Sequence, residues 1–165
     1  MKKKLRLGLS LTLLVGLLAP SSVFAQSSYE DLLNAPENGS AVFVESEPSE
    51  ITPFAAYGKI YYTADYEVTT NYRIPRDIVV PSSTLNSIRI SSSATPNTNP
   101  STKDYQVVLD EFSTWSGGYI GVQTVTIPVN VSRYEYFENL KTNTEYRLKI
   151  VGNVKGTITA YEQTR

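Results

Sequence analysis

The chain is 165 residues long and carries 15 basic and 16 acidic side chains, but it contains neither cysteine nor histidine. The absence of these two residue types excludes disulfide bonds, Ser–His–Asp and Cys–His nucleophiles and the usual ligands of zinc, copper and non-haem iron. Carboxylate catalysis, a lysine- or tyrosine-based scheme and an oxygen-ligated calcium site remain open.

Residues 1–25 have the pattern of a secretory signal peptide. A basic head with Lys2–Lys4 and Arg6 precedes an apolar run from Leu7 to Ala19, and the segment ends in Val23-Phe24-Ala25, as a signal peptidase requires. The apolar run is too short to span a membrane. The sequence therefore predicts a secreted, extracellular protein that starts at Gln26 and does not insert into a membrane. The cysteine-free composition is typical of a Gram-positive bacterium.

A chain that starts at Gln26 has 140 residues, with 11 basic and 16 acidic side chains and a net charge of −5. Nucleic acids and anionic membranes select clustered lysine and arginine, so neither is expected as a partner. The length suits one domain stabilised by apolar burial alone. The sequence gives no signal for a cofactor. It also has no Asp-x-Asp-x-Asp-Gly calcium loop, so no metal ligand is assigned.

Residues 26–55 are predicted to form an acidic leader or pro-segment in front of a domain over residues 56–165. The segment has six acidic residues, and the first basic residue after the signal peptide is Lys59. A capping box at residues 28–31 indicates a short helix that ends at Leu33 or Asn34. We interpret the segment as a flexible leader with one strand, Ala41–Val44, that pairs with the core. A pro-segment and an acidic interaction arm are the alternatives.

From Ala56 onward the pattern is that of β-strands. Apolar and polar residues alternate strictly between Gly58 and Val68, which is the strongest strand signal in the chain. Pro75 interrupts residues 72–80, which therefore form an edge strand, a bulge or two short strands. Residues 91–103 have the composition of a low-complexity loop. Further strands are predicted over residues 85–91, 104–112, 119–131, 133–137, 145–151 and 156–162.

Seven or eight strands with so little helix predict an all-β fold, an antiparallel β-sandwich with a barrel as the alternative. The apolar face of each strand defines the expected core. Its members are Tyr62, Tyr66, Tyr105, Val107, Leu109, Val125, Ile127, Leu140, Tyr146, Leu148 and Ile150.

The stretch from Leu140 to Ile150 resembles the tyrosine corner of fibronectin type III and related immunoglobulin-like domains. In that family a leucine ends one strand and Thr-x-Tyr opens the next; Leu140, Thr144 and Tyr146 stand at these positions. Thr142-Asn143 replaces the usual Pro-Gly, and asparagine tolerates a left-handed turn. The resemblance implies that the Tyr146 hydroxyl bonds to backbone upstream and pins a corner of the sandwich. It implies no activity, because such folds mostly host binding and spacing roles.

Three aromatic residues are the candidate binding residues. Trp115 and Tyr119 flank Gly117-Gly118 in a short loop, and a tryptophan at a loop tip rarely serves the core of its own domain. Tyr61 precedes Tyr62 in a strand, so the two rings point to opposite faces and one of them is expected to be exposed. Exposed tyrosine and tryptophan rings bind sugars or protein partners because they combine apolar area with a polar group.

Carboxylate pairs are the enzyme-like feature of the sequence. Asp65 and Glu67 share one face of a predicted strand, and Asp110 and Glu111 lie in another. Glycosidases use two carboxyl groups across a substrate cleft, whereas carboxylates on an outward sheet face more often keep the protein soluble.

We therefore expect a secreted, non-enzymatic β-sandwich that binds an extracellular polysaccharide, the cell wall or a protein partner. The alternatives are a small secreted enzyme or toxin that acts through carboxylates, and a secreted inhibitor that presents the Trp115 loop to its target.

Overall fold

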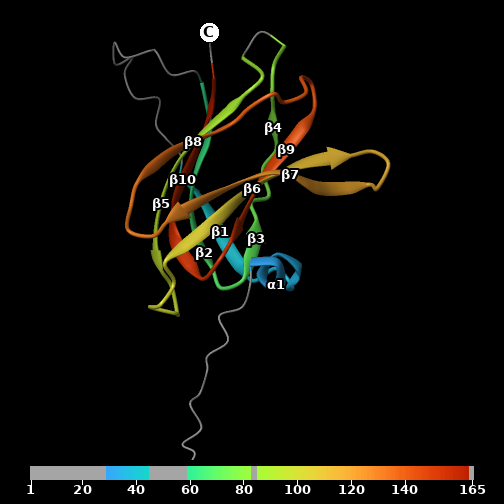
Figure 1. Ribbon diagram of the computed structural model, residues 1–165. Helices are drawn as coiled ribbons and strands as arrows, with labels where there is room; N and C mark the ends of the chain where they lie inside the picture. Colours follow the sequence, from blue (N-terminus) through green and yellow to red (C-terminus); the bar gives the residue numbers. More distant parts are fainter. Residues whose placement is uncertain (1–28, 45–58, 83–84, 164–165) are drawn as a thin grey trace, which may run out of the picture.

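Two antiparallel β-sheets pack face to face in the computed structural model, which describes residues 29–44, 59–82 and 85–163 (Figure 1). The predicted signal peptide lies outside the described residues. The elements are α1 (Tyr29–Asn34), β1 (Gly39–Val44), β2 (Ile60–Val68), β3 (Asn71–Arg73), β4 (Ile78–Val79), β5 (Ile88–Pro96), β6 (Asp104–Ser113), β7 (Gly118–Pro128), β8 (Arg133–Phe137), β9 (Glu145–Val151) and β10 (Val154–Glu162).

The first sheet has the strand order β1-β2-β10-β5-β8, and the second has the order β3-β9-β6-β7 with β4 also paired to β9. Every pairing between these strands is antiparallel. The predicted antiparallel β-sandwich is therefore confirmed, with ten strands in the described part instead of seven or eight. The additional strands arise because β1 joins the sheet and because residues 72–80, which contain Pro75, form the two short strands β3 and β4.

The core lies between the two sheets and contains the side chains that the alternation placed there. Ten of the eleven expected residues are buried, and Val125 is partly buried against them. Tyrosine hydroxyls inside the core are bonded to each other through a serine: the Ser92 Oγ lies 2.8 Å from the Tyr105 hydroxyl and 3.5 Å from that of Tyr66. Burial of aromatic rings thus accounts for much of the apolar packing. The hydroxyls of Tyr66 and Tyr105 are paired through Ser92, whereas the buried Tyr62 hydroxyl has no hydrogen-bond partner among the described residues.

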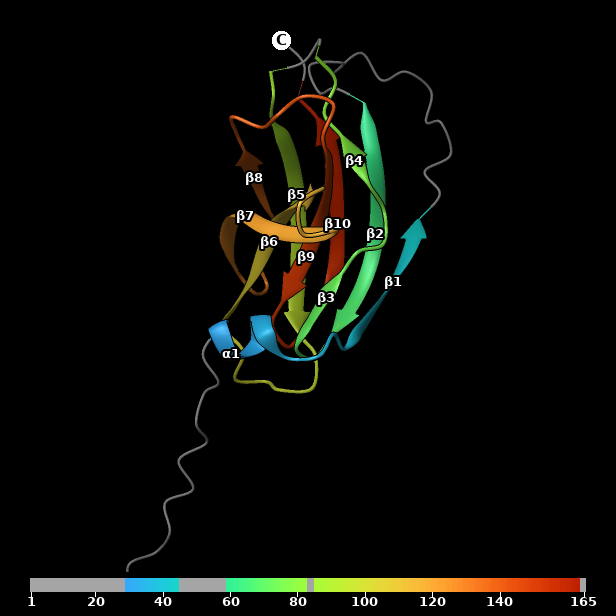
Figure 2. The ribbon, with the colours of Figure 1, turned by 90° about the vertical axis from the view of Figure 1, so that its right-hand side faces the viewer.

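Residues 29–44, which we expected in a flexible leader, are built into the sandwich. Strand β1 pairs with β2 along six residues, as Figure 2 shows at the edge of the first sheet. The buried side-chain amide of Asn71 donates to the carbonyl oxygens of Leu32 at 2.6 Å and Ala35 at 2.8 Å, near the end of α1. The Phe43 ring packs edge-on against Tyr62, with their centroids 5.7 Å apart. The strand predicted at Ala41–Val44 is thus present as part of β1, and it pairs with the core as expected.

The expected loop over residues 91–103 is wrong for its first half, because β5 continues to Pro96. Ser92 and Ala94 are buried and point toward the core, where the Ser92 hydroxyl meets those of Tyr66 on β2 and Tyr105 on β6 of the other sheet. A serine-rich sequence can therefore form an inner strand of a sheet when large side chains from other strands fill the space above it.

The segment from Leu140 to Ile150 forms a corner between β8 and β9. The Tyr146 side chain is fully buried, and its hydroxyl accepts a hydrogen bond from the Lys141 N–H at 2.9 Å. Asn143 has a φ of 55°, the left-handed conformation that a glycine usually adopts in such turns. A relation to the fibronectin type III family stays a prediction.

Candidate functional site

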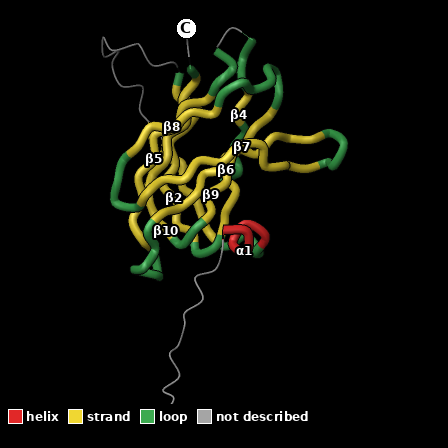
Figure 3. The backbone as a smooth tube through the Cα atoms, in the orientation of Figure 1, coloured by secondary structure: helices red, strands yellow, loops and turns green. Residues whose placement is uncertain are grey.

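The hairpin end of β6 and β7 projects from the body of the sandwich (Figures 1 and 3). We call residues 112–120 the Trp115 arm. Trp115 lies in the turn at its tip and is 95% exposed. Gly117 has a φ of 66° in this turn, and its N–H donates to the Ser113 carbonyl oxygen at 2.9 Å. The turn therefore holds a large aromatic ring entirely in solvent on a backbone with a defined hydrogen-bonded shape.

Tyr119 is half-buried at the base of the arm. Its hydroxyl donates to the Asp77 carboxylate at 2.5 Å, and the Arg147 guanidinium lies 4.4 Å from the centroid of its ring. Arg147 also forms an ion pair with Asp77 at 2.6 Å, and the Phe112 ring packs against Tyr119 with a centroid distance of 5.4 Å. Burial, together with the Asp77 carboxylate, raises the pKa of Tyr119 to about 12. Tyr119 thus fixes the arm to the sandwich.

Trp115 and Tyr119 do not form one aromatic patch, since their rings make no contact with each other among the described residues. Tyr61 lies on β2 of the first sheet, half-buried, and its hydroxyl donates to the Val79 carbonyl oxygen at 3.3 Å. Burial, with the nearby Glu162, raises the pKa of Tyr61 to about 12. Both tyrosine hydroxyls therefore contact residues 77–79, and of the three candidates only Trp115 is free to contact a partner with its whole ring.

The carboxylate pairs of the sequence lie in different settings. Asp110 is 2% exposed and forms an ion pair with Arg73 at 2.6 Å, whereas Glu111 points to the other face of β6 and binds the Lys141 ammonium at 2.6 Å. Adjacent residues of a strand face opposite ways, so these two carboxyl groups cannot act together in one cleft. Asp65 and Glu67 are both exposed on the outer face of β2.

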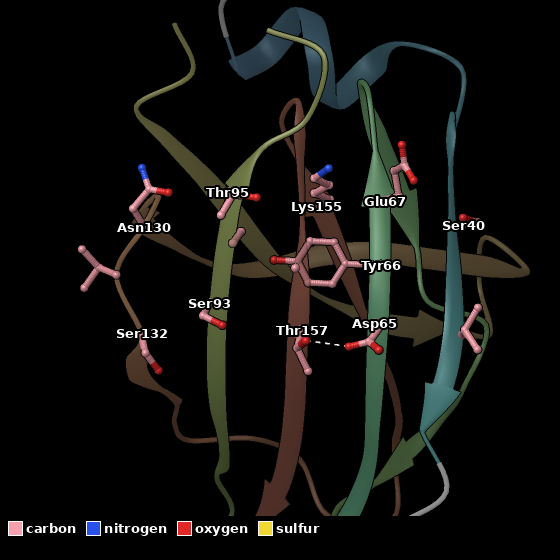
Figure 4. A pocket seen from close by; sticks show the side chains of 14 residues that line it. Ser40, Asp65, Tyr66, Glu67, Ser93, Thr95, Asn130, Ser132, Lys155 and Thr157 are labelled. Carbon is pink, nitrogen blue, oxygen red and sulfur yellow. Dashed lines mark hydrogen bonds between the residues drawn. The ribbon is translucent and has the colours of Figure 1, made fainter. Parts of the chain in front are cut away.

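A groove of about 600 Å³ crosses the outer face of the first sheet, and Figure 4 shows its lining. It contains Asp65 and Glu67, which the sequence had singled out, but its other polar residues were not expected. Hydroxyl groups at alternate positions along β5 and β10 were the signal that could have identified them. The additional polar residues are Ser40, Ser93, Thr95, Asn130, Ser132, Lys155 and Thr157.

A smaller hollow, of about 350 Å³, lies on the outer face of the second sheet at the base of the arm. Lys149 lines it and donates to the Leu33 carbonyl oxygen of α1 at 3.1 Å. Burial lowers the pKa of the Lys149 ammonium, and the cation of Arg73 acts in the same direction. Arg73 and Asp110 on the same wall are joined in their ion pair.

Two further observations concern only the described residues. They contain no group of three or more acidic side chains arranged to hold a metal ion. None of their helices has the length and apolar character needed to cross a lipid bilayer.

No protein-family model matches the chain, and no curated protein matches it. Among solved structures, PirA has 12% sequence identity and a TM-score of 0.40, over 66% of this chain and 99% of that chain. The C-terminal family 22 carbohydrate-binding module of Clostridium thermocellum Xyn10B has 12% identity and a TM-score of 0.37, over 75% of this chain and 77% of that chain. The enzymatically active domain of tailspike protein 4 of Bacteriophage CBA120 has 11% identity and a TM-score of 0.37, over 81% of this chain and 19% of that chain.

Proposed function

We propose that the protein is a secreted, non-enzymatic binding module whose Trp115 arm contacts a wall or matrix polysaccharide outside the cell. The observation that carries this proposal is the 95% exposure of Trp115 at the tip of a projecting hairpin. A tryptophan in this position does not contribute to the core. Burial of its ring against a ligand would remove a large apolar area from water, which favours binding.

The fixed base of the arm supports a binding role. Tyr119, Asp77 and Arg147 form a connected set of hydrogen bonds and ring contacts, so the arm is positioned before any ligand arrives. A ligand that meets a preorganised contact loses less free energy to the ordering of loops and side chains.

A protein partner is the second candidate, and the edge of the second sheet favours it. Strand β7 is the last strand of that sheet, so its outer edge pairs with no other strand of the described part. Ile120 and Val122 on β7 are 48% and 46% exposed and extend the apolar surface from the arm along this strand. An inhibitor that presents the Trp115 loop would use the same surface.

The test is co-sedimentation of the purified protein with insoluble Gram-positive cell wall, cellulose and chitin, compared with a Trp115→Ala variant. We expect the variant to bind at least about fivefold more weakly, a loss of ~1 kcal/mol, with nearly unchanged thermal stability. Leu85→Ala serves as the control, because Leu85 is 46% exposed but lies in neither the Trp115 arm nor the lining of the groove on the first sheet. Equal sedimentation of wild type and Trp115→Ala would contradict the proposal.

A further inference from the structure

We infer that the groove on the outer face of the first sheet is a second binding site, which takes an extended, neutral glycan chain. The site is separate from the Trp115 arm, because its lining comes from β1, β2, β10, β5 and the connection between β7 and β8 (Figure 4). The inference therefore stands whether or not the arm binds a partner.

The shape of the groove suits an extended ligand. Its volume of about 600 Å³ falls in the usual range for ligand sites, roughly 300–1,000 Å³. Four adjacent strands, from β1 to β5, span about 14 Å across the sheet, which is long enough for more than one sugar ring. Val42 of β1 and Val131 of the β7–β8 connection are 67% and 41% exposed and line the groove near its two sides.

The floor of the groove is low because its central side chains are small. Ser93 of β5 is the outward residue there, and it pairs with Thr157 of β10. Two short hydroxyl side chains thus line the centre of the groove and leave it open to a ligand.

The chemistry of the lining selects a polyhydroxylated ligand. Asp65 accepts a hydrogen bond from the Thr157 hydroxyl at 2.5 Å and keeps further acceptor capacity. Glu67 and Lys155 stand opposite each other in the register, yet neither takes part in an ion pair among the described residues. Carboxylates, an ammonium group and hydroxyls together offer both acceptors and donors to sugar hydroxyls, which are donors and acceptors themselves.

The same lining disfavours other ligand classes. Two carboxylates, Asp65 and Glu67, face one ammonium, Lys155, so a polyanionic chain would meet net repulsion. An apolar ligand would leave these charged groups without water or hydrogen-bond partners, which costs free energy. A neutral glycan avoids both penalties.

An aromatic platform lies on the same outer face beyond the groove. Tyr134 of β8 pairs with Ser91 of β5, two residues before Ser93 on the same side of that strand, and its ring is 60% exposed. The Arg89 guanidinium lies 5.1 Å from the centroid of this ring and 4.4 Å from that of Tyr161. These contacts hold the Tyr134 ring in place, and a held aromatic ring is a surface on which a sugar ring can stack.

Isothermal titration with soluble hexamers of glucose and of N-acetylglucosamine, and with an oligomer of galacturonic acid as the anionic comparison, tests the inference. We expect at least one neutral hexamer to bind and Ser93→Tyr, which fills the groove, to weaken its binding at least tenfold. Thr126→Tyr, the same enlargement at an exposed position on β7 of the other sheet, should change the affinity by less than twofold. Asp65→Asn adds no bulk and should weaken binding as well, so the test does not depend on whether Ser93→Tyr folds.

Three results would overturn the inference: no binding of either neutral hexamer, binding of the galacturonic acid oligomer alone, or neutral binding that Ser93→Tyr and Asp65→Asn both leave unchanged. Trp115→Ala separates this site from the arm. A hexamer that binds at both the groove and the arm should show two sites per chain, of which Trp115→Ala removes one and Ser93→Tyr the other. Failure of the proposed arm function would leave a single site that Trp115→Ala does not affect. Loss of hexamer binding in Trp115→Ala with full binding in Ser93→Tyr would move the glycan site to the arm.

Discussion

Tyrosine takes an unusual share of the core, and each buried ring brings a hydroxyl that needs a partner. The chain has 12 tyrosines, and Tyr62, Tyr66, Tyr105 and Tyr146 are at most 4% exposed. Ser92 links the hydroxyls of Tyr66 and Tyr105, while Tyr146 uses the backbone of Lys141. Such pairing removes most of the cost of burying a polar group, and it fixes the positions of these three rings. The Tyr62 hydroxyl is the exception, since it is buried with no hydrogen-bond partner among the described residues.

Replacement of Tyr146 by phenylalanine keeps the ring but removes the hydroxyl. The Lys141 N–H then loses its acceptor, and we expect Tyr146→Phe to lower the free energy of unfolding by about 1–2 kcal/mol in chemical denaturation. Tyr134→Phe, the same change on a ring that is 60% exposed, should have almost no effect on the unfolding midpoint. If the two variants were equally stable, the hydrogen bond between Lys141 and Tyr146 would not contribute to the free energy of unfolding.

At the scale of single elements, the Trp115 arm depends on contacts at its base. The Asp77 carboxylate receives hydrogen bonds from both Tyr119 and Arg147. The Arg147 guanidinium beside it holds the pKa of Asp77 below its usual value. The Asp77 contacts are therefore present above the unfolded pKa of an aspartate, about 4, and are lost as the pH falls through the lower folded value.

Arg147→Ala removes the ion pair and the ring contact together, so it should loosen the arm. We expect the heteronuclear NOE of residues 114–118 to fall, with only a small change in unfolding free energy because the pair is partly exposed. Arg133→Ala, which removes the exposed pair with Glu135 on β8, should leave the NOE of the arm unchanged. An equally rigid arm in Arg147→Ala would mean that the β6–β7 pairing alone holds it.

Alternation along the sequence was sufficient to predict most strands, because each buries one face against the other sheet. It predicted β8 and β9 at their observed bounds and β2 within two residues. It failed where large side chains of one strand fill the space above small ones on another, as at Ser92 in β5. The packing of α1 against the sandwich could not be predicted either, because it depends on hydrogen bonds from the Asn71 amide, which is far from α1 in the sequence.

The two candidate sites also differ in how far the sequence predicts them. The exposure of Trp115 follows from a local loop sequence, so it could be predicted from its neighbours alone. Alternating hydroxyl groups mark the outward residues of β5 and β10, but the groove itself could not be predicted. Ser40, Asp65, Ser93 and Thr157 become neighbours only through the register of four strands that are distant in sequence. A shift of one residue in any of those pairings would turn the polar row inward.

For the molecule as a whole, the absence of histidine and the excess of buried tyrosine determine how stability varies with pH. No side chain has an ordinary pKa near neutrality, so the free energy of unfolding should be almost constant between about pH 6 and pH 9. Burial raises the pKa of Tyr62, Tyr66, Tyr105 and Tyr146 above the unfolded value of 10.

These pKa shifts determine whether the free energy of unfolding rises or falls at high pH. A group whose folded pKa is raised contributes its full stability below the unfolded pKa, and this contribution is lost as the pH rises toward the folded value. Lys149 acts in the opposite direction, because its folded pKa is lowered and the unfolded chain then holds its proton more tightly. One lysine opposes four tyrosines, so the tyrosines determine the net trend.

We therefore expect stability to decrease above about pH 10, by ~1.4 kcal/mol per pH unit for each buried tyrosine that must stay protonated. Denaturation curves at a series of pH values, recorded together with near-ultraviolet phenolate absorbance, test this expectation. The absorbance of the buried tyrosines should rise together with unfolding, and Tyr66→Phe should reduce the steepness of the loss because it removes one titrating group. Complete titration of all tyrosines near pH 10 in a protein that is still folded would show that the rings between the two sheets are accessible to hydroxide, and would contradict the tightly packed core described above.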